Sequence, residues 1–499
     1  MSLNKHIFKV GAWTGVSRVL GFIRDMMVAN VLGAGRLSDI FLAAFKLPNL
    51  FRDLLGEGAL SMVFIPMFAK HKNRKKIGEF FASNVFSWLM MVLLAITIAA
   101  EIFMPLIVWA LAPGFASDPG KLQLTVIISR ILFFYVIFVC GLAFLSGILN
   151  AFSEFATAAA MPAMLNVFMI AGVFLAKYHG AGDAAVYILA FAVVIAGIFQ
   201  MGILWLRLRR RQFGLRLIMP RRTTHIKTMF RRIGTGFVGT AFYHVNIFVG
   251  MLIASYQTGA VSWLYYSDRM VQLPFAIIGL AAGTVLLTAV SDALAEKNYE
   301  KIYAQQNSSM RNIMLFTLPC VAGLFVLAVP IMQYLFEHGA WTHESTIAVA
   351  RAMMIMALAL PAMTTSQIFS RTLYASQDVR TPVKINIVTF ASFVVVALGL
   401  VHWFGYLSVP IATVASGYFR NIWLRRVCEK RGLFKTFPGT RHAMFAFGAL
   451  SVIIGLGLWW TMHVGLIYNL MTMVAAIALA GAVYLPAAWT VNKKFKSNK

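Results

Sequence analysis

Charged residues are scarce in this chain of 499 residues. Asp, Glu, Lys and Arg make up only 12% of it, against about 25% of an ordinary globular protein. Hydrophobic residues make up 60%. So few charged side chains cannot cover a water-soluble surface of this size, which excludes soluble enzymes, disordered regulators and fibrous proteins. The composition indicates a protein dissolved in a lipid bilayer.

Cysteine and catalytic motifs are also scarce. The three cysteines, Cys140, Cys320 and Cys428, are too far apart for a metal site and too few for a disulfide framework. No zinc-protease motif, nucleophile elbow, phosphate-binding loop or Asp-rich metal motif occurs, and the ten histidines have no ligand spacing. We therefore expect no enzymatic activity, no cofactor and no metal site. We also expect the first apolar segment to be retained, because it lacks the short apolar core of a signal peptide.

Long apolar runs are abundant. A membrane-spanning helix needs about 20 mostly apolar residues, and the runs that meet this lie near residues 7–32, 39–69, 79–111, 122–149, 156–176, 184–206, 233–255, 260–290, 308–336, 345–373, 383–402, 407–424, 442–463 and 466–489. We therefore predict an all-α polytopic membrane protein with about 14 transmembrane helices.

The basic residues fall on one side of these spans. In the predicted topology, 31 Lys and Arg residues lie on the side of the N-terminus and only Arg36, Lys121 and Lys177 on the other. Because Lys and Arg are enriched in cytoplasmic loops, we predict that both termini are cytoplasmic. The net charge of +27 is then an orientation signal, and we expect no nucleic-acid partner.

The chain repeats itself at an offset of 220–229 residues. Ser38-Asp39 is echoed by Ser267-Asp268, and Leu47-Pro48 by Leu273-Pro274. Two further echoes keep the same order, namely Leu149-Asn150-Ala151 with Leu373-Tyr374-Ala375, and Pro162-x-x-x-Asn166 with Pro382-x-x-x-Asn386. Such a long period suits a duplicated transporter half. We predict two six-helix pseudo-symmetric lobes, 1–206 and 233–424, a basic linker 207–232, a basic loop 425–441, and two extra helices in 442–499.

Several charged residues lie inside the predicted spans. Arg311, Arg371 and Arg420 fall near cytoplasmic ends and can extend to the interface. Arg18, Arg24 and Arg52 lie deeper, where an arginine costs about 2.5–3.5 kcal/mol, and Arg130 and Asp268-Arg269 complete the set. One interpretation is ion pairing within the membrane, with Asp25, Asp39, Asp53 or Glu57. The other is a polar cavity lined by arginines.

An arginine-lined cavity indicates an anionic, phosphorylated ligand, because the guanidinium fork matches phosphate oxygens and stays charged when desolvated. We predict that Arg18, Arg24, Arg52, Arg130 and Arg269 bind it. The acids Asp25, Asp39, Glu57 and Asp268 can pair with these arginines when an outer gate shuts. Pro48 and Pro274 are predicted hinges, because each removes a backbone hydrogen bond inside a span.

The residues also resemble a known family. Leu47-Pro48-Asn49 with Arg52, then Gly56-Glu57-Gly58-Ala59-Leu60-Ser61 and Phe64-Ile65-Pro66, is similar to the signature of the MurJ (MviN) lipid II flippases. These belong to the MATE-like multidrug/oligosaccharidyl-lipid/polysaccharide exporters. Supporting matches are the segments 17–25, 111–115, 149–151, 267–269 and 378–384. The chain departs from the family at Ala158, Ala276 and Thr288.

The resemblance implies a flippase that moves lipid II, an undecaprenyl-diphosphate-linked peptidoglycan precursor, to the outer leaflet of the bacterial cytoplasmic (inner) membrane. The positions that carry over are Arg18, Arg24, Asp25, Asp39, Arg52, Glu57, Arg130, Asp268 and Arg269. We expect alternating access, a groove for the lipid tail at the last two spans, a monomer, and membrane lipids and peptidoglycan synthases as partners.

Four alternatives remain open at this stage. A MATE-like drug or cation antiporter would favour intramembrane acids over arginines. A flippase for another polyprenyl-linked saccharide would use the same cavity. An enzyme acting on polyprenyl phosphates would need a metal or nucleophile that the sequence lacks, and a non-transporting scaffold would tolerate charge reversal in the cavity.

Overall fold

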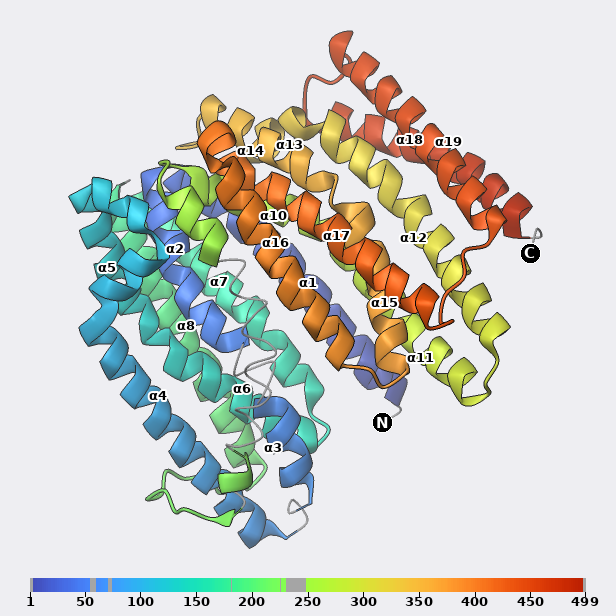
Figure 1. Ribbon diagram of the computed structural model, residues 1–499. Helices are drawn as coiled ribbons and strands as arrows, with labels where there is room; N and C mark the ends of the chain where they lie inside the picture. The colour runs from blue at the N-terminus through green and yellow to red at the C-terminus, as the bar shows by residue number, and fades with distance from the viewer. Residues whose placement is uncertain are drawn as a thin grey trace. The chain divides into compact units, whose positions relative to one another are not determined.

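The computed structural model describes residues 3–53, 60–70, 74–180, 182–224, 226–229 and 248–496, and every regular element in these ranges is helical (Figure 1). The chain divides into two compact units. Unit 1 comprises Met1–Ser262 together with His338–Trp341, and unit 2 comprises Trp263–Glu337 together with Thr342–Lys499. The division therefore falls after the third residue of the helix Ala260–Pro274, and the later segment His338–Trp341 packs with unit 1.

The described part of unit 1 contains eight α-helices before residue 211. Their bounds are α1 Leu3–Leu32, α2 Arg36–Phe51, α3 Leu60–Ala69, α4 Lys75–Leu111, α5 Pro119–Phe133, α6 Tyr135–Ala151, α7 Phe155–His179 and α8 Asp183–Arg210, with a 3₁₀ turn η2 at Pro113–Ser117. Residues 248–255 are also helical. Helix α1 packs along α7, which in turn packs along α8, and α2 lies against α5. Figure 1 shows α1, α7 and α8 running alongside one another.

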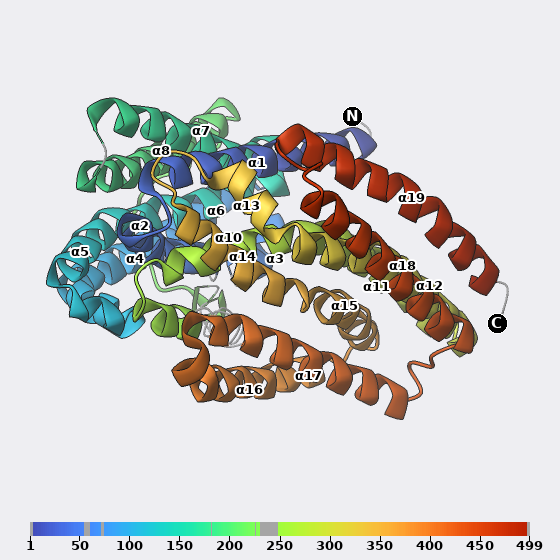
Figure 2. The same cartoon turned by 90° about the horizontal axis from the view of Figure 1, so that it is seen from above.

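Helix α10 (Ala260–Pro274) leads into unit 2. The elements that follow are the π-helical turn η3 Phe275–Leu280, α11 Ala281–Ala295, α12 Tyr299–Val326, α13 Ala328–Phe336, α14 His343–Ala357, α15 Leu360–Ala375, α16 Arg380–Phe404, η4 Gly405–Leu407, α17 Ser408–Lys430, α18 Pro438–His463 and α19 Leu470–Lys496. Figure 2 shows two adjacent pairs, α16 beside α17 and α18 beside α19.

Nine helical ranges among the described residues are long and apolar enough to cross a membrane. They are Lys75–Leu111, Pro119–Ala151, Phe155–His179, Asp183–Arg210, Tyr299–Val326, His343–Ala375, Arg380–Lys430, Pro438–His463 and Leu470–Phe495. The range Arg380–Lys430 holds two helices that turn at Gly405. Within the described residues, four runs predicted as single spans are interrupted. Helices α5 and α6 meet at Phe134, η3 separates α10 from α11, α12 and α13 meet at Leu327, and α14 and α15 meet at residues 358–359.

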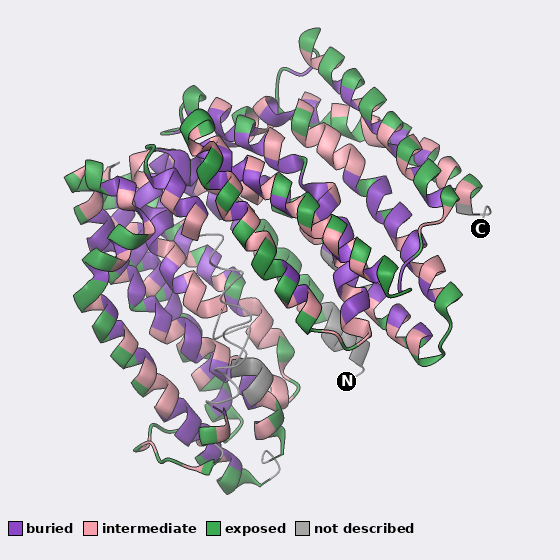
Figure 3. Ribbon diagram, in the orientation of Figure 1, coloured by how far each residue is buried: buried purple, intermediate pink, exposed green. Residues whose placement is uncertain are grey.

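Large apolar side chains point outward along many of these helices. In α4, Ile102 is 65% exposed and Leu106 60% exposed, and Val395 of α16 is 71% exposed. Figure 3 shows exposed stripes along α4, α16 and α19. Such surfaces are unfavourable in water but suit a hydrocarbon solvent, so these stripes are lipid-facing.

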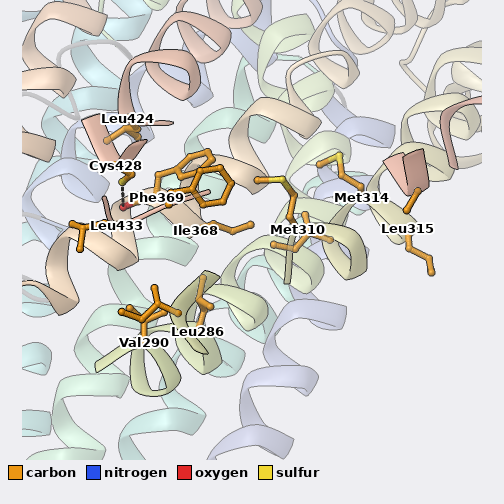
Figure 4. Close-up of a cluster of buried hydrophobic side chains, with 14 of the residues drawn as sticks. Leu286, Val290, Met310, Met314, Leu315, Ile368, Phe369, Leu424, Cys428 and Leu433 are labelled. Carbon is orange, nitrogen blue, oxygen red and sulfur yellow. Dashed lines mark hydrogen bonds between the residues drawn. The ribbon is translucent and has the colours of Figure 1, made fainter. Parts of the chain in front are cut away.

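A cluster of buried side chains holds unit 2 together. Its members come from α11, α12, α15, α16, α17, α18 and α19 and from the segment that joins α17 to α18 (Figure 4). Phe369 of α15 lies at its centre, where Phe434 meets its ring edge-on and the Sγ of Cys428 donates to its carbonyl oxygen at 3.8 Å. Cys428 and Cys140 are fully buried and act as small core residues, while Cys320 is only partly buried.

Two helical hairpins close in the same way. Helix α6 ends at Ala151, Ser153 has φ +63°, and the Glu154 N–H donates to the Leu149 carbonyl. Helix α15 ends at Ala375, Gln377 has φ +62°, and the Asp378 N–H donates to the Leu373 carbonyl. Both are Schellman-type caps with a non-glycine residue in the left-handed position.

The carboxylate beyond each cap binds the far end of the hairpin that follows. Glu154, just before α7, pairs with Arg207 at the end of α8 (3.1 Å) and also with Arg211. Asp378, just before α16, pairs with Arg431 after the end of α17. Glu154 with Asp378 and Arg207 with Arg431 are each 224 residues apart, the spacing of the Leu149 and Leu373 echo. The two hairpins therefore share a cap and a closing ion pair.

The basic segment after α8 is docked on α4. Its backbone N–H groups at Gly214, Arg216 and Ile218 donate to the side chains of Glu79, Ser83 and Ser87 at 2.8, 3.1 and 2.9 Å. Two extended residues advance about 6.6 Å and four helical residues about 6.0 Å, so the two repeats stay in register. Phe213 and Leu215, which alternate with Gly214 and Arg216 along the chain, belong to a buried cluster that includes Phe68 and Phe81. We call residues 212–223 the strap.

Candidate functional site

Arg24 of α1 is the most enclosed of the candidate ligand-binding arginines in the described part of the chain. Its side chain is 10% exposed, and its Nε and Nη2 donate to Asp25 Oδ1 at 3.0 and 2.5 Å. Its Nη1 donates to Asn166 Oδ1 of α7 at 2.9 Å, and the Asn166 amide donates back to the Ser17 carbonyl of α1 at 2.9 Å. The packing of α1 along α7 therefore places this guanidinium.

Asp25 pairs with its neighbour Arg24 and not with Arg18, although Arg18 and Asp25 are seven residues apart and share a helical face. Arg18 lies in the exposed first half of α1, near the exposed side chain of Val19. Residues 9–19 of α1 are mostly exposed, because α1 packs against α7 and only slightly against α2 and α8. The two arginines thus differ, with Arg24 held in place and Arg18 on an open face.

Arg52 and Arg130 also lie beside acids. Arg52 follows the end of α2 and donates from Nε and Nη2 to Asp53 Oδ1 at 3.2 and 3.0 Å, with both side chains about one third exposed. Arg130 of α5 lies 3.9 Å from Glu101 of α4 and is 44% exposed. Arg24 and Arg52 thus pair with two of the acids named in the ion-pairing interpretation, whereas Arg130 lies beside an acid that the interpretation did not name.

Asp39 of α2 is fully buried and binds the start of α10. Its Oδ1 accepts from the Ser262 N–H at 2.9 Å and from the Ser262 hydroxyl at 2.7 Å, and its Oδ2 accepts from the Gly259 N–H at 2.7 Å. Lys121 of α5 donates to Oδ2 at 2.8 Å and is only 3% exposed. A carboxylate beside free N–H groups at a helix start is stabilised by the helix dipole.

A second charge cluster lies one turn away on the same two helices. Arg36 at the start of α2 pairs with Asp118 at 3.3 Å and with Asp183 of α8 at 3.2 Å. The pKa of Asp118 is lowered, first because the Lys121 backbone N–H donates to it at the start of α5, and also because Arg36 is close. Together with Asp39 and Lys121, these contacts join α2, α5 and α8 at one end of unit 1.

The segment His338–Trp341 packs on the end of α1. The Ala340 N–H donates to the Asn30 carbonyl at 2.8 Å. Gly339 has φ +65°, and a Cβ there would collide with the backbone and side chain of Asn30. Gly33 has φ +68°, and a Cβ there would collide with the Ala340 carbonyl. Both positions therefore require glycine for this close approach.

The remaining candidates are Pro48 of unit 1, three residues of unit 2, and positions outside the described residues. Asp268 and Arg269 of α10 are half-buried, and Asp268 accepts from Gln272 one turn later. Pro274 is the last residue of α10 and comes directly before η3, whereas Pro48 lies inside α2 near its end. Glu57 and most of the predicted span 233–255 lie outside the described residues. In the ranges that the structure covers, no group of three metal-binding side chains occurs.

Several residues at these sites could not be identified from the sequence. Lys121 was counted as an outer cation, and its burial beside Asp39 depends on tertiary packing. Ser262 and Glu101 carried no signal of their own. Asn166 did carry one, since it belongs to the repeated Pro-x-x-x-Asn pattern, but its contact with Arg24 could not be read from that.

Comparisons with known proteins agree with this architecture. A solved structure titled "Lipid II flippase MurJ, inward closed conformation" superimposes with a TM-score of 0.82 at 22% identity, over 97% of this chain and 99% of that one. An inward-facing multidrug resistance MATE family transporter of the MOP superfamily superimposes with a TM-score of 0.68 at 14% identity, over 83% of this chain and 94% of that one. The fold and the charges buried among apolar helices thus define a multi-span membrane protein with the fold of the MOP transporters.

The sequence comparisons give the particular family. The family profile described as "Lipid II flippase MurJ" matches residues 28–480. A "Probable lipid II flippase MurJ" of Rhizobium tropici is 32% identical over 98% of this chain and 95% of its own length. The chain therefore belongs to the lipid II flippase MurJ family, a family of transporters and not of enzymes, and the resemblance first seen in residues 47–66 is confirmed.

Proposed function

We propose that this chain carries lipid II from the inner to the outer leaflet of the bacterial cytoplasmic membrane by alternating access, and so supplies precursor for peptidoglycan synthesis. The observation that carries this proposal is its membership of the family over almost its whole length. The buried guanidinium of Arg24 adds a chemical reason, because a diphosphate needs cationic donors that stay charged out of water.

The fuller architecture is part of the proposal. It has 14 transmembrane helices in two six-helix lobes, 1–206 and 233–424, joined by the linker 207–232, with two further helices after the loop 425–441. The repeated caps at Leu149 and Leu373, with their closing ion pairs, support a duplicated half. Both termini face the cytoplasm, and α18 and α19 form the groove for the lipid tail. The chain acts as a monomer and hands its cargo to peptidoglycan synthases.

Arg24 and Arg52 exchange partners during transport. Each is bound to the aspartate that follows it in sequence, so a diphosphate must compete with Asp25 and Asp53. This competition keeps the cation compensated in the membrane when cargo is absent. Arg18, on the open face of α1, meets the headgroup first, and Arg130 and Arg269 complete the binding set.

Asp39, Asp25, Glu57 and Asp268 act as gate residues. The gate role is best supported for Asp39, because this carboxylate accepts four hydrogen bonds at the start of α10. The donors are Lys121, Gly259 and Ser262, of which Ser262 donates twice. Release of those bonds frees the start of α10. Pro48 and Pro274 act as hinges, and the change from α- to π-helix directly after Pro274 supports this role.

The test is lipid II exposure at the outer face of intact cells that rely on this chain alone. An impermeant enzyme that cleaves lipid II measures the exposed pool. Arg24→Glu and Arg52→Glu should each reduce exposure to the level of depleted cells while the total lipid II pool rises. Arg222→Glu, an exposed strap position, is the matched control and should leave exposure unchanged at equal amounts of protein in the membrane.

Two further measurements separate the alternatives. Arg24→Lys keeps the charge but cannot bind Asp25 and Asn166 together through one planar fork, so it should transport at an intermediate rate. Normal exposure in both charge reversals would overturn the cavity assignment. Unchanged exposure on depletion, together with efflux of a cationic dye by the purified chain, would replace the flippase by an antiporter.

A further inference from the structure

Helix α17 carries a groove near its C-terminal end that none of the roles above uses. The groove has a volume of about 540 Å³ and is lined by residues of this helix alone among those described, namely Phe419, Ile422, Trp423, Arg426, Val427 and Lys430. Phe419 and Ile422 are more than 40% exposed. These two side chains open outward, whereas Trp423 and Val427 form the base of the groove and pack against the buried cluster of unit 2.

The two cations in this groove differ from their neighbours on the same helix end. Arg425 pairs with Glu429 at 2.8 Å, and Arg431 pairs with Asp378. Arg426 and Lys430 are one helical turn apart and exposed, and within the described ranges neither has an ion-pair partner. Two uncompensated positive charges thus lie at one end of an apolar groove.

We propose that this groove binds one anionic phospholipid of the surrounding bilayer, with its phosphate at Arg426 and Lys430 and an acyl chain along Phe419, Ile422 and Trp423. The order of groups along the groove matches that of a phospholipid, because the two cations lie at the C-terminal end of α17 and the apolar residues lie nearer the middle of the helix. A helix C-terminus carries about half a negative charge, which two full positive charges outweigh. Basic clusters beside spanning helices attract anionic lipid headgroups.

The size of the groove favours a phospholipid chain over the longer polyprenyl chain of the proposed cargo. An apolar cavity of roughly 150 Å³ holds a benzene ring, so about 540 Å³ has room for about one fatty-acyl chain. The proposal does not rest on the proposed function, because it concerns a resident lipid and holds whatever the chain transports.

The experiment is a lipid titration of the delipidated full chain in detergent, followed by native mass spectrometry. The probes are phosphatidylglycerol and phosphatidylcholine with identical acyl chains. One phosphatidylglycerol should bind more tightly than phosphatidylcholine. The double variant R426Q/K430Q should bind it about 30-fold more weakly, since each basic residue near an anionic lipid contributes about five-fold.

The matched control is R210Q/R222Q, which removes two exposed cations from α8 and the strap and should bind as the unsubstituted chain does. Thermal unfolding of both double variants checks that they are folded. A second variant, Trp423→Ala, should weaken both lipids alike, because it removes apolar contact and no charge.

Three outcomes would overturn the proposal. They are equal binding of the two lipids by the unsubstituted chain, unchanged phosphatidylglycerol binding by R426Q/K430Q, and displacement of phosphatidylglycerol by undecaprenyl phosphate at equal concentration. The last result would assign the groove to the polyprenyl carrier and not to a bilayer lipid.

Discussion

At the scale of single residues, the buried pair of Arg24 and Asp25 shows how this chain keeps a cation in a membrane. Removing one member of a buried ion pair leaves an uncompensated charge and costs about 3–5 kcal/mol, whereas replacing both by apolar groups is often nearly neutral. Arg24 also binds Asn166 on α7, so its position is fixed from two helices. An anionic ligand can therefore bind the Arg24 guanidinium only if it displaces Asp25.

This gives a double-mutant prediction. Asp25→Leu alone should destabilise the purified chain by about 3 kcal/mol or more, because Arg24 stays buried without its carboxylate. The double variant R24M/D25L should recover most of that loss. Thermal unfolding in detergent measures both, with Arg18→Met as the control, since Arg18 is exposed. The single variant Arg24→Met completes the cycle, and a double variant whose loss equals the sum of the losses in Asp25→Leu and Arg24→Met would contradict the pairing.

At this scale the sequence identifies the charged residues but not the partners that they bind. Arg24, Asp25 and Asp39 could be singled out because charge inside an apolar run is costly and rare. Their partners could not, because a contact 82 residues away, such as Lys121 with Asp39, is fixed only by tertiary packing. Arg311 was expected to extend to the interface, yet it is 6% exposed and donates to Thr440 and Asn492. Helices α18 and α19 supply both of those partners, so the isolated span of α12 could not reveal them.

At the scale of elements, the duplicated hairpin closure is the clearest structural trace of the sequence repeat. The two caps share their left-handed residue, their backbone bond and a carboxylate that binds an arginine. In each hairpin the chain also turns at a glycine with positive φ, Gly180 after α7 and Gly405 after α16. The echo of Leu149 in Leu373 therefore marks a repeated piece of structure and not a coincidence of composition.

The second closure predicts a pH dependence. The pKa of Asp378 is lowered from its ordinary 3.8 to about 2, first by hydrogen bonds from the Thr381 hydroxyl and N–H and then by Arg431. A lowered pKa means that this group stabilises the fold fully above pH 3.8 and loses that contribution as pH falls toward 2. Asp378→Asn should therefore lower the Tm by roughly 1–2 °C at pH 7, the shift expected for about 1 kcal/mol in a chain of this length.

The difference in Tm between the two proteins should shrink between pH 4 and pH 2 and vanish below it. Glu296→Gln, which breaks the exposed pair with Lys301, is the control and should change the Tm little, because such pairs contribute under about 1 kcal/mol. A difference that stays constant down to pH 2 would show that Asp378 does not titrate in this range.

The strap gives a prediction about local stability. Asn84 of α4 both accepts from the Arg221 N–H at 2.7 Å and donates to the Arg221 carbonyl at 2.9 Å. Asn84→Ala removes two bonds of about 1 kcal/mol each, so tryptic cleavage after Arg221 and Arg222 should be roughly 10- to 30-fold faster. Mass spectrometry of the fragments locates the cuts. Met91→Ala, at an exposed α4 position, should be cleaved like the unsubstituted chain, and equal rates in both variants would mean that the strap is not held by Asn84.

At the scale of the whole molecule, the sequence predicts the fold class well and the helix breaks poorly. Long apolar runs fixed the positions of α1, α4, α7, α8, α18 and α19 to within a few residues, because hydropathy and length leave few choices. The break after Pro274 had a signal, since proline removes a backbone bond. The break at Phe134, between α5 and α6, had none: neither glycine nor proline stands there, so packing within unit 1 decides it.

Orientation is the remaining whole-molecule prediction, and the hairpin α7/α8 tests it. Its helices have 25 and 28 residues, about 37 and 42 Å long at 1.5 Å per residue, which exceeds the roughly 30 Å of hydrocarbon. Gly180, at the end of α7, and the basic end at Arg207–Arg211 are therefore expected on opposite sides of the membrane. The charge bias predicts that the basic end lies in the cytoplasm. In a chain whose three cysteines are replaced by alanine, Tyr178→Cys, 86% exposed in the unsubstituted chain, should react with an impermeant thiol reagent in intact cells. Arg222→Cys should react only after the membrane is opened, and the reverse pattern would invert the topology and with it the direction of transport proposed above.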